Sequence, residues 1–152
     1  MAESESRIVM IAVDASAQAD EAFEWYLNNL ARDSDSVKVV HCAEFHLGMS
    51  VGINYDEKQI AQITEQVKKQ QNEVDSLKSK FVDKLRGKIK GEAFILTGKK
   101  PGEAIIEAAE THKANLIICG TRGLGKIRRT FMGSVSDFIV QHARCPVVVV
   151  RK

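Results

Sequence analysis

The sequence predicts an α/β domain with an open, five-stranded parallel sheet that carries helices on both faces. Two observations lead to this class. Short, nearly continuous apolar runs alternate with longer segments whose apolar residues repeat every three or four positions, which is the pattern of βαβ units. The runs also contain few polar residues, as expected of parallel strands covered on both sides. We expect one domain over residues 7–152 of the 152-residue chain, preceded by a disordered acidic tail at 1–6.

The first half of the chain is expected to hold two strands and two helices. A strand at 7–13 leads into a helix from Ser16 to Leu30, for which Ser16 is a suitable N-cap. A turn at 33–36 precedes a second strand at 37–43, and residues 44–56, which have no clear period, are expected to form a loop. In the segment 60–85 the irregular heptads are interrupted at Gln70 and Gln71, which favours a helix lying on a sheet over a coiled coil.

The second half continues the alternation with three more strands. They are expected at 92–97, 116–119 and 146–150, separated by a helix that begins at Pro101 and another at 134–144. Right-handed crossovers would place these helices on both faces of the sheet. In such sheets ligands bind beyond the carboxyl ends of the strands, where the strand order reverses, so we look for functional residues there.

Composition excludes several classes of function. A net charge of +2 provides no general reason to expect nucleic acid or membrane partners, and no apolar run is long enough for a secretory or transmembrane segment. The three cysteines, Cys42, Cys119 and Cys145, lie in or beside apolar runs and are expected to be reduced thiols in a cytoplasmic protein. The four histidines have no recognised zinc spacing.

A basic, glycine-rich segment follows the strand at 116–119 and predicts an anion site. It runs from Gly120 to the helix start at Gly133-Ser134, and glycine amides together with a helix N-terminus can bind phosphate oxygens. Ile127 stands where a Walker A loop needs Ser or Thr, which argues against that motif. A solvated surface loop is the alternative. Its cations are Arg122, Lys126, Arg128 and Arg129.

The spacing Gly120-x2-Gly123-x9-Gly133-Ser134 resembles the G-2x-G-9x-G(S/T) loop of the ATP-binding branch of the universal stress protein family. The resemblance covers nearly the whole chain. It implies a Rossmann-like fold of the adenine nucleotide alpha hydrolase type with strand order 3-2-1-4-5. It also implies ATP, with Mg²⁺, as the cofactor, a homodimer through the edge strand Val147–Val150, and a nucleotide-dependent regulatory role in the stress response.

The resemblance also implies a nucleotide site built from strand ends, the glycine loop and the start of the last helix. By this match Val13, Asp14 and the region of Cys42 would lie near the adenine, although Asp14 could instead cap the first helix. Ser136 could add a hydroxyl, or act as a cap. The expected site residues are Val13, Asp14, Ser16, Cys42, Cys119, Gly120, Arg122, Gly123, Gly133, Ser134, Val135 and Ser136.

Catalytic motifs are lacking in the sequence. It has no Gly-x-Ser-x-Gly elbow, paired carboxylate site or CxxC motif, and Asp137 is the only acid close behind the glycine loop. We therefore expect nucleotide binding without efficient turnover. A slow ATP hydrolase or adenylate-transferring enzyme on the same layout is the alternative. A flavin or redox domain is a third hypothesis, which the basic loop matches less well.

Overall fold

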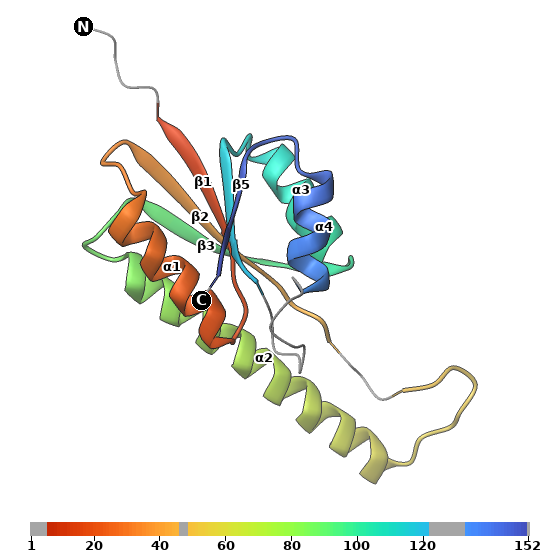
Figure 1. Cartoon of the computed structure of the whole chain (residues 1–152). Helices are drawn as coiled ribbons and strands as arrows, with labels where there is room; N and C mark the ends of the chain where they lie inside the picture. Colours follow the sequence, from red (N-terminus) through yellow and green to blue (C-terminus); the bar gives the residue numbers. More distant parts are fainter. Residues whose placement is uncertain (1–5, 46–48, 122–132, 152) are drawn as a thin grey trace, which may run out of the picture.

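The computed structural model describes residues 6–45, 49–121 and 133–151, and these form a five-stranded parallel sheet with helices on both faces (Figure 1). The strand order is β3-β2-β1-β4-β5, so the fold class and the strand order stated above are confirmed. The elements are β1 (Arg7–Ala12), α1 (Ala17–Asn29), β2 (Asp35–Cys42), α2 (Glu57–Leu85), β3 (Gly91–Leu96), α3 (Pro101–Thr111), β4 (Leu116–Gly120), α4 (Ser134–His142) and β5 (Val147–Val150).

The first strand of the chain, β1, lies in the centre of the sheet. Val9 is opposite Val37 of β2 on one side and opposite Leu116 of β4 on the other. Beyond the end of β1, the Val13 N–H still donates to the Val40 carbonyl at 2.9 Å. The strand order reverses between β1 and β4, so the carboxyl ends of these two strands mark the place where a ligand is expected.

Two apolar layers enclose the sheet. Successive residues of a strand point to opposite faces, and β1 shows this clearly. Val9 and Ile11 belong to the layer formed with α1 and α2, whereas Met10 belongs to the layer formed with α3 and α4. The aromatic residue Phe23 of α1 fills the first layer, with its ring centroid 5.5 Å from that of Phe81 of α2. This two-sided burial explains why the strands are nearly continuous apolar runs.

The turn predicted at 33–36 is wrong in its second half, because β2 begins at Asp35. Asp35 is only 1% exposed. Its carboxylate accepts hydrogen bonds from Arg7 Nε (2.8 Å) and Nη2 (2.7 Å), from Tyr26 Oη (2.5 Å) and from the Arg32 N–H (3.0 Å). Burial alone would raise the pKa of Asp35, but the hydrogen bonds from Arg7 and Tyr26 outweigh it and lower the pKa. A charged partner therefore lets a carboxylate start a buried strand.

Helix α2 is longer than the face of the sheet that it covers. Asp56 caps its start by a capping box with Gln59. Val74 is the first buried residue of the helix, so the prediction of a helix lying on a sheet holds for its second half. The first half and the loop before it extend beyond the sheet on the side where the strands end (Figure 1). We call residues 49–73 the arm. No helix among the described residues is both long and apolar enough to cross a bilayer.

Candidate functional site

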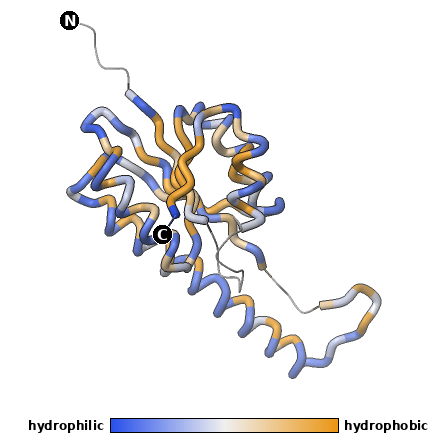
Figure 2. The backbone as a smooth tube through the Cα atoms, viewed as in Figure 1, coloured by the Kyte–Doolittle hydropathy of each residue, from blue (hydrophilic) through white to orange (hydrophobic). Residues whose placement is uncertain are grey.

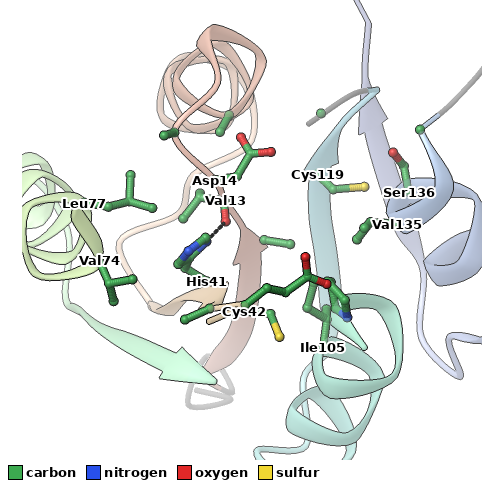
Figure 3. Close-up of a pocket in the computed structure, with 18 of the residues that line it drawn as sticks. Val13, Asp14, His41, Cys42, Val74, Leu77, Ile105, Cys119, Val135 and Ser136 are labelled. Atoms are coloured by element: carbon green, nitrogen blue, oxygen red, sulfur yellow. Dashed lines mark hydrogen bonds between the residues drawn. The ribbon is translucent and has the colours of Figure 1, made fainter. Parts of the chain in front are cut away.

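A cavity of about 480 Å³ lies at the carboxyl ends of β1, β2 and β4, and parts of α2, α3 and α4 complete its wall (Figure 3). It occupies the point at which the strand order reverses. Of the expected site residues, Ser16 does not line the cavity, and Arg122 and Gly123 lie outside the described residues. The structure brings the others together: Val13, Asp14, Cys42, Cys119, Gly120, Gly133, Ser134, Val135 and Ser136.

The inner wall of the cavity is apolar and includes two thiols. Cys42 from β2 and Cys119 from β4 lie on either side of β1, and Ile105 of α3 lies below them (Figure 3). Burial raises the pKa of Cys119 to about 11 and also raises that of Cys42, to which Glu44 contributes. Both thiols are therefore neutral near pH 7 and form small apolar walls rather than nucleophiles.

Asp14 and Ser16 divide the roles of site residue and helix cap. The cap of α1 is Ser16, whose Oγ accepts from the Ala19 N–H at 3.3 Å. Asp14 Oδ1 in turn accepts from the Ser16 N–H at 2.8 Å and from the Ser16 hydroxyl. Asp14 thus supports the cap instead of acting as the cap, and its carboxylate lies at the rim of the cavity (Figure 3).

His41 also lines the cavity, although it is not among the expected site residues. Its Nδ1 is 2.9 Å from the carbonyl oxygen of Val13. A carbonyl can only accept, so Nδ1 carries a proton and donates this hydrogen bond. The imidazole therefore ties the end of β2 to the end of β1.

The two ends of the glycine-rich segment meet at the carbonyl of Thr121. This oxygen accepts from the Gly133 N–H at 2.5 Å and from the Ser136 hydroxyl at 3.1 Å. Ser136 is buried and does not cap α4, because the N-cap residue is Gly133, which has no side chain. Among the described residues, no side chain therefore caps the backbone N–H groups that follow Gly133, which is the arrangement that binds an anion.

Gly120 has a packing reason in addition to any role toward a ligand. A Cβ on this residue would lie 3.0 Å from the carbonyl oxygen of Gln18 in α1. Such a contact is tighter than ordinary van der Waals packing, so glycine lets the start of α1 approach the end of β4 closely.

Sequence reasoning missed the helical part of the wall. The residues concerned are Ala19 of α1, Gln70, Glu73, Val74 and Leu77 of α2, and Pro101 and Ile105 of α3. The apolar period of α2 was visible, but it did not show which turn of the helix reaches the strand ends.

The charged side chains of the described wall are all acidic: Asp14, Glu44 and Glu73. The cations of the glycine-rich segment, Lys126, Arg128 and Arg129, lie outside the described residues, as Arg122 does. Within residues 6–45, 49–121 and 133–151, no three His, Cys, Asp or Glu side chains are placed to hold a metal ion.

Comparisons with known proteins agree on one family. The model of the universal stress protein family matches residues 5–151. A universal stress protein A-like protein of Arabidopsis thaliana is 31% identical over 163 aligned residues, covering 98% of this chain and 92% of that protein. A solved universal stress family protein of Arabidopsis thaliana with AMP bound is 26% identical and has a TM-score of 0.66, with 96% of this chain and 92% of that chain covered. Universal stress protein UspA from Lactobacillus plantarum shares the fold, with a TM-score of 0.74 at 20% identity over 98% of this chain and 100% of that chain. The chain therefore belongs to the universal stress protein family.

Proposed function

We propose that this chain binds ATP, together with Mg²⁺, in the cavity at the strand ends and acts in the cytoplasm as a nucleotide-dependent regulatory protein of the stress response. One observation carries the proposal. The cavity joins an apolar slot between strand ends to the first turn of α4, which no side chain of the described residues caps. A purine base suits the slot and a phosphate group suits the helix start. The relative with AMP bound supports an adenine nucleotide.

The acidic wall determines how the nucleotide would be oriented. Glu44 and Glu73 would repel phosphate, so the base belongs beside Val13 and Cys42 and the phosphates belong at Ser134. Mg²⁺ in nucleotide sites is commonly held by one or two carboxylates together with phosphate oxygens. Asp14 is the carboxylate that fits this role, since the Ser16 contacts hold its side chain at the rim. The ion would offset phosphate charge there.

Binding without turnover is part of the proposal. The acid nearest to the helix start, Asp137, accepts a hydrogen bond from Gln141 Nε2 at 2.8 Å along its own helix. It is therefore engaged on the surface of α4, instead of directing a water molecule toward a phosphate at Ser134. Product formed well beyond one equivalent per site, and lost in Ser134→Ala, would support the slow hydrolase in place of this function.

We also propose a homodimer through β5. Its residues Val147–Val150 pair with β4 on one side only, so β5 forms an edge of the described sheet. Val148 and Val150 pack into the layer of α1, while Val147 and Val149 pack into the layer of α4. All four are only half-buried, and an apolar edge strand is a surface that pairs readily with a second chain.

The experiment that tests the binding proposal is the release and identification of the bound ligand. Protein purified without added nucleotide is denatured in acid, and the released compound is identified and counted by mass spectrometry. We expect an adenine nucleotide near one equivalent per chain, and none in Gly133→Asp, whose carboxylate would occupy the anion position. Lys100→Asp is the matched control, because it places the same side chain at the N-cap of α3, outside the cavity. A wild-type protein that is empty and also ignores added ATP in calorimetry would refute the proposal.

A further inference from the structure

The arm carries most of the exposed apolar surface of the described residues. Seven large apolar side chains are exposed among the described residues of the chain. Four of them belong to the arm: Met49 (53%), Val51 (106%), Ile53 (56%) and Ile60 (51%). Figure 2 shows hydrophobic residues along the loop that precedes α2 and along the part of α2 that projects beyond the sheet. Scattered exposed apolar residues are ordinary, but a concentration on one projecting element marks an interaction surface.

Three of these residues lie in the loop before α2, and the fourth, Ile60, begins an apolar seam that the sheet covers farther along the helix. Ile60, Val67, Val74 and Phe81 follow at intervals of seven. The second seam position holds Ile63, Gln70 and Leu77, and Gln70 also lines the cavity. From Val74 onward the seam is buried against the sheet. Before Val74 it is at best half-buried, although helix α2 runs unbroken for 29 residues, a length of about 43 Å. A seven-residue repeat is the pattern by which one helix packs along another.

The charges of the arm favour a second copy of this chain over an oppositely charged partner. Carboxylates and lysines nearly cancel, leaving a net charge of −1, so the arm has no strong field for an acidic or basic peptide and no like-charge barrier to self-association. Half of its uncharged polar residues are glutamines, which tolerate either neighbour. The charged residues are Asp56, Glu57, Lys58, Glu65, Lys68, Lys69 and Glu73.

We propose that the arm pairs with the arm of a second copy, with the two α2 helices antiparallel. The sheet already covers the seam from Val74 onward, so a parallel pair would drive the two sheets into each other. An antiparallel pair instead places each Ile60 near the root of the partner's arm and keeps the bodies apart. Such a contact is isologous and two-fold symmetric. Residues 49–73 also match in size the roughly 20–30 residues that each side of a standard interface contributes.

This interface is separate from the β5 edge. The arm lies beyond the carboxyl ends of the strands, whereas Val147–Val150 run along the side of the sheet (Figure 1). A chain with two isologous surfaces assembles beyond a dimer. The two contacts can therefore be removed one at a time.

The test is sedimentation velocity on the full chain over a range of protein concentrations. Ile60→Lys places a charge in the seam, and Gln62→Lys is the matched control on the polar face of the same helix turn. Both are made in the wild type and in Val148→Lys. We expect Val148→Lys to remain a dimer through its arms, and Val148→Lys with Ile60→Lys to be a monomer. Ile60→Lys should raise the dissociation constant of the arm contact by roughly tenfold to a hundredfold, because apolar burial is lost. Gln62→Lys should raise it by less than about twofold.

Two outcomes would overturn the inference. One is a Val148→Lys chain that is monomeric at every concentration, which would leave β5 as the contact between copies. The other is an Ile60→Lys chain of unchanged mass that loses its nucleotide, which would assign the arm to the cavity. Hydrogen exchange provides an independent measurement, because backbone amides at 57–67 should gain protection as protein concentration rises. If the β5 dimer does not form, the arm is the contact that remains, and Ile60→Lys alone would already make the chain monomeric. Failure of the β5 proposal is therefore distinguishable from failure of the arm proposal.

Discussion

Replacement of Asp35 by asparagine tests the buried network that joins β1, α1 and β2. Four donors converge on the two carboxylate oxygens, from Arg7 Nε and Nη2, Tyr26 Oη and the Arg32 N–H. Asparagine has the same shape but offers one oxygen, and its amide N–H₂ would face donors. The side chain of Asp35 is fully buried and that of Arg7 is 17% exposed, so the guanidinium would lose its charge partner in a largely dry place. Breaking a buried pair by removing one partner costs about 3–5 kcal/mol.

Thermal and urea unfolding at pH 7 measure this loss. For a domain of this size we expect a drop of about 6–20 °C in Tm. Asp33→Asn is the matched control, because Asp33 is exposed two residues earlier. The pKa of Asp35 is lowered in the folded protein, so its contribution is present above the unfolded pKa of about 3.9 and is lost as the pH falls below it. The difference in the free energy of unfolding between wild type and Asp35→Asn should therefore become smaller below about pH 4. If the free energy of unfolding of Asp35→Asn lies within about 1 kcal/mol of the wild-type value at pH 7, the reasoning is refuted.

Three further outcomes are expected. Gly102→Ala should destabilise the domain by about 1–3 kcal/mol in urea, since a Cβ would lie 2.7 Å from the Phe138 ring; an unchanged midpoint would mean that α3 and α4 separate freely. Ser136→Ala removes the hydroxyl that donates to the Thr121 carbonyl. It should cost about 1 kcal/mol and weaken ATP binding in calorimetry, whereas wild-type affinity would separate this bond from the site. At pH 8 iodoacetamide should modify Cys119 at least roughly a hundredfold more slowly than a free thiol, because burial raises its pKa to about 11. Peptide mass spectrometry follows the reaction, and labelling at the free rate would contradict that burial.

The sheet was predictable because its strands are buried on both faces. β1 and β4 read as apolar runs for the same reason that Met10 and Ile117 are fully buried, which is contact with helices on each side. Asp35 was assigned to a turn because its partners are distant in the chain. Arg7 lies 28 residues before it and Tyr26 lies nine residues before it. No local pattern reveals that two such groups will meet a carboxylate at the start of a strand.

The cavity was predictable where strands end and unpredictable where helices pass. Asp14 and Gly120 follow from the rule that ligands bind at the carboxyl ends of parallel strands, Val13 follows from the family resemblance, and all three line the cavity. Gln70 and Glu73 line it only because α2 overshoots the sheet by several turns. Helical periodicity indicates which face is apolar but not how far along the axis the sheet reaches. The role of Ser136 likewise depended on Thr121, which lies 15 residues earlier.

The central position of β1 has a consequence for synthesis on the ribosome. β1, β2 and β3 form one side of the sheet and are complete at Leu96, whereas the second neighbour of β1 arrives only with β4, and β5 ends at Val150. At 5–20 residues per second, roughly 3–11 s separate these two points. The nascent chain presents an open edge of β1 until β4 ends at Gly120, and it presents part of the apolar face of the sheet until α4 ends at His142. In this period it most needs protection from other nascent chains. The cavity needs both β1 and β4, so no ligand bound there can help the first half to fold.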